Sequence, residues 1–382
     1  MVAEEKDATT SSLILDSLEV KGFRGFRHLQ IEKLGRVNLI VGKNGVGKTA
    51  LLESLLLYIR RGSPFEISKM LLSRDEGDML PTQRMTVGKI DNNMMALKHL
   101  FYGRKDIRED LEAIEIGPIA RQNNKNGRLS ISIGRYVSKT YPNSDTYFEP
   151  IEERDDMSVY SFLGLRILMG NLVNSIYRLD TMTIDTIRKK DPLSSCVFVP
   201  AYRENRIEVG NLWDSIHITE LEVEVINAIR IIAPSVERLG LVVTASNGPQ
   251  TERIPIVKVT RFDEPIPLRS LGEGMNRLFG IALALVNAKG GMLLIDEVES
   301  GLHYSVQPDV WKLIFETAAR LNVQVFATTH SWDCIEAFQK AAKESDEEGL
   351  MIRLAEKKGE IIADVFGEKE LEIATRENIE LR

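Results

Sequence analysis

The chain has 382 residues, a formal net charge of -7, and 43% apolar and 27% charged residues. This length is enough for one large α/β domain with insertions or for two lobes, and the composition is that of a globular protein rather than a disordered or fibrous one. The acidic balance excludes a strongly basic nucleic-acid coat, so contact with DNA needs independent evidence.

The two cysteines, Cys196 and Cys334, have neither the paired spacing of a zinc site nor the density of a disulfide scaffold. We therefore expect two buried thiols in a reducing compartment. No apolar stretch is long enough to span a bilayer, and the amino-terminal residues lack the basic and apolar regions of a secretory signal. The sequence predicts a cytoplasmic protein without a membrane segment.

The amino-terminal segments predict a strand, a glycine-rich loop and a helix. Residues 1–11 are polar and are expected to form a flexible leader, after which residues 13–23 alternate as a half-buried strand does. Residues 36–42 form a second, β-branched strand that ends in glycine. Residues 49–61 have helical spacing, and the side chains expected to face inward are Leu51, Leu52, Leu55 and Leu56.

The middle of the chain has weaker patterns. Residues 62–191 combine short helices around 94–102 with strand-like segments between polar turns, at 128–134 and 146–151. A strand, a helix and two further strands follow, at 194–201, 219–232, 239–245 and 254–262. We expect residues 63–264 to form an inserted α+β or helical subdomain.

The last third of the chain returns to a regular pattern. Two apolar strands, at 291–296 and 323–329, bracket a helix, which indicates a parallel sheet. Residues 341–382 predict a hairpin and a charged helix. The expected fold class is α/β, with lobes at 12–62 and 265–340 on either side of the insertion.

The first candidate site is a phosphate-binding loop with the pattern G-x-x-x-x-G-K-[ST], which runs from Gly42 to Thr49. Its glycines let the loop wrap, so that backbone N–H groups face phosphate oxygens beside the positive end of a helix. Lys48 is expected to reach the β- and γ-phosphates, and Thr49 to coordinate Mg²⁺. The candidate nucleotide contacts are Asn44, Gly45, Val46, Gly47, Lys48, Thr49 and Ala50.

The second candidate site is the end of the strand at 291–296, where Asp296 is followed by Glu297. In enzymes with this loop, a neighbouring strand delivers an aspartate to the Mg²⁺ shell, and Asp296 suits that role. Glu297 suits a general base that polarises water for attack on the γ-phosphate. Together with the loop, the pair predicts catalytic ATP hydrolysis.

The third and fourth elements are the pentapeptide SLGEG at 270–274 and His330. The pentapeptide precedes an apolar helix expected over 275–287, which indicates a second anion site, although a capped turn is an alternative. Its candidate contacts are Ser270, Gly272 and Glu273. His330 ends the strand at 323–329, where a histidine is often structural, but its place in the βαβ unit favours contact with the γ-phosphate.

These four elements in this order resemble the ABC-type ATPase superfamily. The resemblance implies a head with mixed sheets and a phosphate-loop core, ATP and Mg²⁺ as cofactors, and two chains that close head to tail around two nucleotides. Ser270 and Gly272 would then reach the ATP of the other chain. The pentapeptide departs from the transporter form LSGGQ, since Leu271 replaces a glycine and Glu273 the glutamine. The segment EVESGLH resembles the D-loop, which implies positions near the dimer seam for Glu299, Ser300 and His303.

The spacing of 222 residues between Lys48 and Ser270 is too long for a transporter domain, and no heptads of a coiled-coil arm lie between them. With VKGFRGF and VNLIVGKNGVGKTALLESL, the chain resembles RecF-like and OLD-family ATPases. That group implies adenine-side contacts for Arg24 and Phe26. The position of the Q-loop stays open between Gln83 and Gln122, each of which is also compatible with an exposed polar residue.

Two functions stay open. OLD-type nucleases continue into a Toprim domain, whereas the 52 residues after His330 are too few and contain no D-x-D pair, so a nuclease is expected on another chain. The first function is an ATP-driven homodimer, or higher even oligomer, that controls a separate nuclease or toxin effector in antiphage defence, with DNA or a phage protein as trigger. The second is a RecF-like ATPase that acts on DNA, for which the basic run Arg188, Lys189 and Lys190 is a candidate contact.

Overall fold

The structure is a computed structural model that describes residues 13–76, 96–108, 111–119, 127–140, 146–151, 161–170, 173–180, 195–201, 206–243 and 252–377. The expected leader, the Gln83 and Gln122 alternatives and the basic run at 188–190 lie outside these ranges. Within the described part of the chain, no helix is both long and apolar enough to cross a bilayer.

A six-stranded sheet forms the centre of the fold, in the order β16-β15-β3-β14-β13-β9. All neighbours in it are parallel except the hairpin partners β15 and β16. The strands are β3 Val37–Val41, β9 Cys196–Val199, β13 Met292–Ile295, β14 Gln324–Thr328, β15 Gly349–Lys357 and β16 Glu360–Phe366. The expected parallel βαβ unit and the carboxy-terminal hairpin are thus confirmed.

An antiparallel sheet lies on one side of this centre, in the order β2-β1-β4-β5-β7-β8 with β6 paired to β5. Its strands are β1 Leu18–Phe23, β2 Phe26–Ile31, β4 Ile114–Gly117, β5 Leu129–Thr140, β6 Thr146–Pro150, β7 Ser161–Met169 and β8 Val173–Arg178. A small sheet on the other side contains β10 Val236–Val243, β11 Arg253–Val259 and β12 Ile266–Pro267. The expected mixed-sheet α/β class is therefore confirmed.

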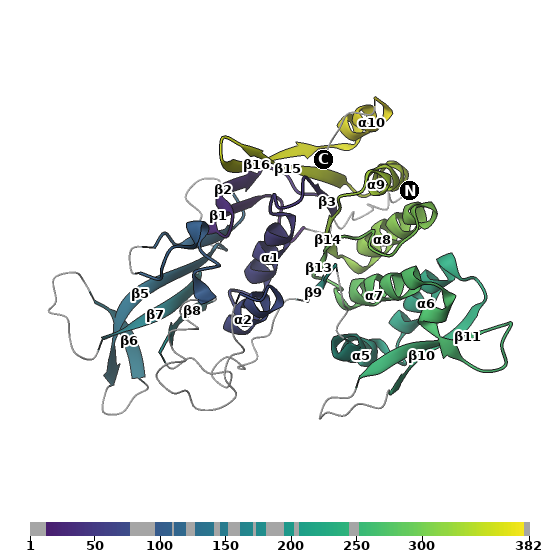
Figure 1. Cartoon of the computed structure of the whole chain (residues 1–382), viewed down its shortest axis with the longest axis horizontal. Coiled ribbons are helices and arrows are strands. Elements are labelled where there is room, and N and C mark those ends of the chain that lie inside the picture. Colours follow the sequence, from purple (N-terminus) through teal and green to yellow (C-terminus); the bar gives the residue numbers. More distant parts are fainter. Residues whose placement is uncertain are drawn as a thin grey trace, which may run out of the picture.

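Helices separate these sheets (Figure 1). On the side of the antiparallel sheet lie α1 Lys48–Ile59 and α2 Pro64–Ser73. On the other side lie α5 Arg206–Ile216, α6 Glu220–Ile232, α7 Glu273–Asn287, α8 Gln307–Leu321 and α9 Trp332–Glu344, while α10 Glu368–Arg376 lies against α9 and the hairpin. Within the described ranges, short 3₁₀ turns lie at Tyr102–Arg104, Leu268–Leu271 and Tyr304–Val306.

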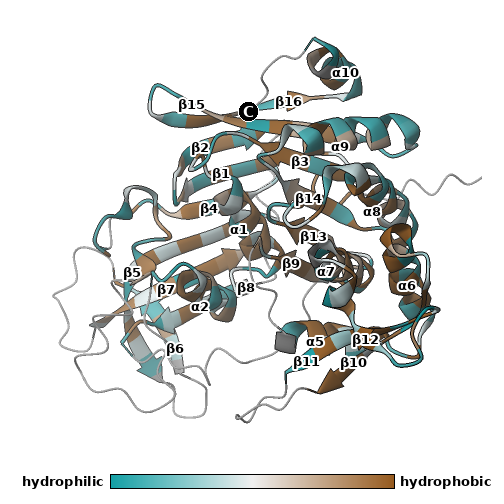
Figure 2. Cartoon of the chain, turned by 45° about the vertical axis from the view of Figure 1, so that its right-hand side comes forward, coloured by the Kyte–Doolittle hydropathy of each residue, from teal (hydrophilic) through white to brown (hydrophobic). Residues whose placement is uncertain are grey.

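The alternation of β3 divides the apolar core in two. Leu39 and Val41 face a core shared with α6, α7, α8 and α9, whereas Ile40 faces a core shared with α1 and the antiparallel sheet. Figure 2 shows apolar residues concentrated on the central strands and on α7, between these layers. Because both faces of the sheet are buried, its strands are nearly continuous apolar runs.

The structure bears on two expectations from the sequence, the buried face of α1 and the insertion at 63–264. Leu51, Leu52 and Leu55 are buried as expected, but Leu56 is only half-buried and Leu57 is buried instead. Leu56 packs against the edge of the core and also lines a cavity of about 560 Å³ that borders Thr49 and Asp296. The region expected as an insertion, 63–264, contains β9, which pairs with β13 in the central sheet. The division into lobes stays a prediction.

Candidate nucleotide site

The glycine-rich loop connects β3 to α1 in a conformation that depends on glycine. Gly42, Gly45 and Gly47 have φ values of 146°, 81° and 103°, which residues with a Cβ rarely adopt. A Cβ on Gly42 would lie 2.5 Å from the carbonyl oxygen of Leu354, and one on Gly47 would lie 3.0 Å from the ring of Phe26. A side chain would therefore be crowded at Gly42 and Gly47, whereas Gly45 has nothing within 4 Å and favours glycine only through its positive φ.

The loop places Lys48 at the first residue of α1, where the free N–H groups of the first helical turn create a positive potential. The Nζ of Lys48 donates hydrogen bonds to the carbonyl oxygens of Gly42 at 2.7 Å and Lys43 at 3.2 Å. Partial burial lowers the pKa of Lys48, and the nearby carboxylates of Asp296, Glu297 and Glu299 oppose this shift. A cationic group thus faces three acids across the end of the sheet.

The remaining loop residues have different exposures. Asn44 and Gly45 are exposed, Val46, Gly47 and Thr49 are half-buried, and Ala50 is buried. The exposed part of the loop is the part at which an anionic ligand would arrive.

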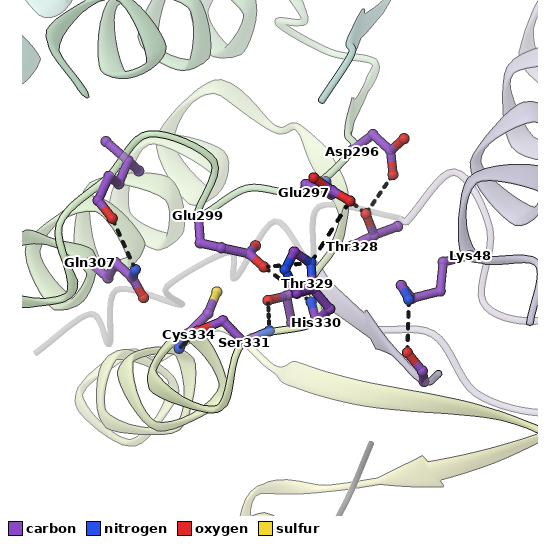
Figure 3. A network of polar contacts seen from close by, with 12 residues as sticks. Lys48, Asp296, Glu297, Glu299, Gln307, Thr328, Thr329, His330, Ser331 and Cys334 are labelled. Carbon is purple, nitrogen blue, oxygen red and sulfur yellow. Dashed lines mark hydrogen bonds and ion pairs between the residues drawn. The ribbon is translucent and has the colours of Figure 1, made fainter. Parts of the chain in front are cut away.

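Thr49 and Asp296 meet although they are 247 positions apart in the chain. The hydroxyl of Thr49 contacts both carboxylate oxygens of Asp296, at 3.2 Å and 3.0 Å. The buried hydroxyl of Thr328, at the end of β14, donates to Oδ1 of Asp296 at 2.6 Å. Three adjacent elements thus converge on one carboxylate, as Figure 3 shows for Asp296 and Thr328.

Glu297 follows Asp296 in a sharp backbone bend. Its φ is 48°, in the left-handed region that a residue with a Cβ rarely adopts, and its N–H donates to the Thr328 hydroxyl at 2.8 Å. The guanidinium of Arg277, from α7, donates to the carbonyl oxygens of Asp296 and Glu297 at 2.6 Å and 2.9 Å. The side chain of Glu297 is 25% exposed, so its carboxylate can reach solvent and a substrate.

His330 is about half exposed and lies beside two acids (Figure 3). Its Nδ1 is 3.3 Å from Oε1 of Glu299 and 3.8 Å from Oε1 of Glu297, and its backbone N–H donates to Glu299 at 3.1 Å. The structure thus brings the histidine and the carboxylate bend together at the carboxyl ends of neighbouring parallel strands.

Ser270 and Gly272 lie on the surface in the turn before α7, and Glu273 is the first residue of that helix. The segment at 297–303, predicted as a D-loop, packs against this helix start, because a Cβ on Gly274 would lie 2.7 Å from the carbonyl oxygen of Gly301. In this segment Ser300 is half-buried and His303 exposed, and the ring of His303 lies tilted against that of Tyr304 at a centroid distance of 4.3 Å.

Arg24 and Phe26 do not lie on the exposed surface of the loop. The Arg24 guanidinium is buried in ion pairs with Glu53 and Glu76, each at 2.7 Å. Phe26 is 1% exposed and packs beneath Gly47. Their positions indicate support of α1 and of the loop, so the adenine contacts expected for them stay a prediction that the geometry does not favour.

The donor set fits Mg²⁺ bound to a nucleotide. A hydroxyl and a carboxylate already in contact are hard oxygen ligands, and Mg²⁺ in phosphate sites takes one or two such protein ligands beside phosphate oxygens and water. Within the described ranges no group of three or more His, Cys, Asp or Glu residues is arranged to hold a metal alone. The arrangement therefore suits a metal that arrives with a phosphate ligand.

Comparison with known proteins agrees with this geometry. A family described as "AAA domain, putative AbiEii toxin, Type IV TA system" matches residues 197–333, and one described as "AAA domain" matches residues 17–62. Two stretches of the chain are thus similar to AAA-type ATPase domains. The two matches cover the loop, α7, the acid pair and His330.

Three relatives with different names are similar to this chain over different lengths. An ATP/GTP phosphatase of Helicobacter pylori is 22% identical over 358 residues, covering 87% of this chain and 90% of that protein. The uncharacterized protein MJECL11 of Methanocaldococcus jannaschii is 35% identical over 82 residues, 22% of this chain and 72% of that protein. The DNA replication and repair protein RecF of Clostridioides difficile is 44% identical over 55 residues, 14% of this chain and 15% of RecF.

Among solved structures, an SmcHead bound to the C-winged helix domain of ScpA is similar, with a TM-score of 0.49 and 14% identity over 92% of this chain and 98% of that one. The resemblance to the OLD family is not tested by these relatives and stays a prediction.

Sequence reasoning missed two polar residues that hold the site together, Thr328 and Arg277. A signal for Arg277 was present, because an arginine within the apolar helix MNRLFGIALALVN must find acceptors when it is buried. Thr328 had no comparable signal, since threonine is common in strands.

Proposed function

We propose that the chain binds ATP with Mg²⁺ on the Gly42–Thr49 loop and hydrolyses it. The observation that carries the proposal is the contact of the Thr49 hydroxyl with Asp296 at 3.0 Å, beside the cationic Lys48 and the bend at Glu297. This arrangement joins an anion-binding loop, two oxygen ligands for a divalent ion and a candidate base at one edge of a sheet.

Each residue has a role in the proposed reaction. Lys48 and the loop amides bind phosphate oxygens, while Thr49 and Asp296 are the protein ligands of Mg²⁺. When bound, the ion neutralises charge on the phosphates. Glu297 orients a water and accepts its proton, and His330 donates a hydrogen bond to the γ-phosphate from its position beside Glu299. Thr328 and Arg277 hold the backbone that carries both acids.

The second part of the proposal is a shared site. Ser270 and Gly272 are exposed at the start of α7, and His330, the proposed γ-phosphate contact, is 52% exposed. A second copy that presents its own Ser270 and Gly272 to this ATP would supply another helix amino terminus for the phosphate. ATP would then favour the associated state, because its γ-phosphate makes contacts that exist only there.

For the cellular role, we propose an ATP-driven switch that controls a separate nuclease or toxin effector in prokaryotic antiphage defence. Support comes from the matched family, whose description includes a toxin of a toxin–antitoxin system. The alternative is a DNA-maintenance ATPase, supported by the RecF relatives, which match a short segment. The net charge of -7 favours a protein partner over DNA.

The test compares the wild-type chain with Glu297→Gln, in ATP and Mg²⁺, for phosphate release and molecular mass. Glutamine keeps the size of the side chain but cannot accept the proton, so turnover should fall about 10²- to 10⁴-fold while ATP-dependent association persists. Turnover at the wild-type rate would show that Glu297 is not the base. Salt-dependent binding of the wild-type chain to duplex DNA would favour the alternative role.

A further inference from the structure

Arg277 is a buried cation in the helix that begins at the SLGEG turn. It is 7% exposed, one helical turn into α7, and its described contacts are backbone oxygens rather than solvent. One terminal nitrogen donates to the carbonyl of Pro200 at 2.6 Å, and the other donates to those of Asp296 at 2.6 Å and Glu297 at 2.9 Å. One planar guanidinium thus joins α7 to the end of β9 and to the end of β13.

Two of the three oxygens that Arg277 binds, those of Asp296 and Glu297, belong to the strained bend. Glu297 has a φ of 48°, and its N–H is fixed by Thr328 on the opposite side. Since a left-handed residue with a Cβ persists only where its surroundings hold it, the two carbonyl contacts help to set the direction of both acid side chains. Arginine suits this position because its rigid planar fork holds donors on separate nitrogens at fixed directions, whereas the donors of an ammonium group all radiate from one nitrogen.

The helix start is also in direct contact with the segment after the bend. Gly274 approaches the carbonyl oxygen of Gly301 so closely that a Cβ would lie 2.7 Å from it. Gly274 and Arg277 are three residues apart, so they lie on the same face of α7 and both touch the segment 296–301. A displacement of the exposed turn at Ser270 and Gly272 would therefore reach this segment through two contacts.

We propose that Arg277 is a positioning residue that transmits the position of the SLGEG turn to the backbone of Asp296 and Glu297. This inference rests on the proposed ATPase function. A second copy that contacts Ser270 of one chain would, through Arg277, alter the position of Asp296 and Glu297 in that chain. Arg277 touches neither nucleotide nor water in this scheme, so it acts on turnover and not on the binding of the phosphates.

The experiment compares the full-length wild type with Arg277→Lys and Arg277→Met. The matched control is Asn287→Ala at the other end of α7, where the Asn287 amide donates to the carbonyl oxygens of Leu283 at 2.8 Å and Leu212 at 3.2 Å. The readouts are kcat and KM for ATP, binding of a fluorescent ATP analogue, the melting temperature, and hydrogen exchange of residues 296–301.

The expected result for both Arg277 variants is a kcat lowered about 10- to 100-fold, as for other residues that orient a metal ligand, with KM and analogue affinity changed less than about twofold. Exchange in 296–301 should rise. Asn287→Ala should lower the melting temperature without either effect. The milder Arg277→Lys decides the result if Arg277→Met does not fold.

If both Arg277 variants match Asn287→Ala in kcat and exchange at equal melting temperature, the positioning role is overturned while the ATPase function stands. If the wild type hydrolyses no ATP but exchange still rises only in the Arg277 variants, the proposed function fails and the positioning of the bend is retained.

Discussion

The hydroxyl of Thr328 donates to Oδ1 of Asp296 at 2.6 Å and accepts a hydrogen bond from the N–H of Glu297 at 2.8 Å. One buried side chain on β14 therefore holds the carboxylate of one acid and the backbone of the next. This arrangement couples the proposed Mg²⁺ ligand to the proposed base, since neither can shift without breaking a contact to the same oxygen.

Replacing Thr328 by valine should destabilise the protein and weaken the use of Mg²⁺. Valine has nearly the same shape but leaves the buried Glu297 N–H without this acceptor, which costs about 1–3 kcal/mol of unfolding free energy. The Mg²⁺ concentration for half-maximal ATPase activity should rise about 10- to 100-fold, because Asp296 loses an orienting contact. Thr328→Ser, which keeps the hydroxyl, is the control. An unchanged Mg²⁺ dependence in the valine variant would remove Thr328 from the site.

Arg24→Met tests whether Arg24 stabilises the fold or contacts adenine. Loss of Arg24 removes one guanidinium partner of the buried Glu53, although Arg74 still pairs with Glu53 at 2.7 Å, so the free energy of unfolding should fall by up to about 3–5 kcal/mol with nucleotide affinity unchanged. Burial already raises the pKa of Glu53 from 4.5. The difference in unfolding free energy between the wild type and Arg24→Met should therefore shrink as the pH falls through this raised pKa, because protonation of Glu53 removes the buried charge. A loss of ATP affinity at full stability would support the adenine contact.

Glu19 should contribute stability that is lost in acid. Burial raises its pKa, but hydrogen bonds from Arg128 and His28 outweigh this, and the pKa falls from 4.5 to about 2. A folded-state pKa below the unfolded value gives stability that is complete above pH 4.5 and disappears as the pH falls to about 2.

Glu19→Gln should accordingly lower the free energy of unfolding by at most about 3 kcal/mol at pH 7. Urea titrations between pH 7 and pH 3 measure the difference from wild type, which should narrow below pH 4.5. A difference that stays constant with pH would contradict the ionic origin of the effect.

Both cysteines should be unreactive in the folded protein. Cys196 and Cys334 are buried, as expected from their spacing, and burial raises the pKa of each thiol to about 12. A disulfide reagent at pH 8 should therefore titrate both thiols together only as the chain unfolds. Rapid reaction of either thiol under native conditions would show that the region around it opens locally.

The phosphate loop could be predicted because its chemistry is local. The spacing of Gly42, Gly47, Lys48 and Thr49 determines a turn between a strand and a helix, and that turn is present. The parallel strands around 291–296 and 323–329 were predictable for the same reason, since long apolar runs with a helix between them have few alternatives.

The partners of the site residues could not be predicted because they come from distant segments. The residues next to Arg24 in the sequence do not indicate whether its guanidinium contacts a ligand or the buried Glu53. Likewise, β9 pairs with β13 from the middle of a weakly patterned region, and a strand's neighbours in a sheet are not encoded in its own sequence. The missed helix α5 does carry apolar residues at helical spacing, Val209, Leu212, Trp213 and Ile216, so its pattern was present in the sequence and was overlooked.

Mixing two inactive variants tests whether one site is shared between two copies of the chain. Ser270→Arg should block the surface that one chain offers, and Glu297→Gln should remove the base of the other. In a mixed dimer, one of the two sites contains an intact Ser270 from one chain and an intact Glu297 from its partner.

ATP turnover is measured for each variant alone and for their equimolar mixture. The shared site predicts little turnover alone and recovery to about a quarter of the wild-type rate on mixing, because half of the dimers are mixed and each has one intact site. Turnover in the mixture equal to the mean of the two variants alone would contradict the shared site.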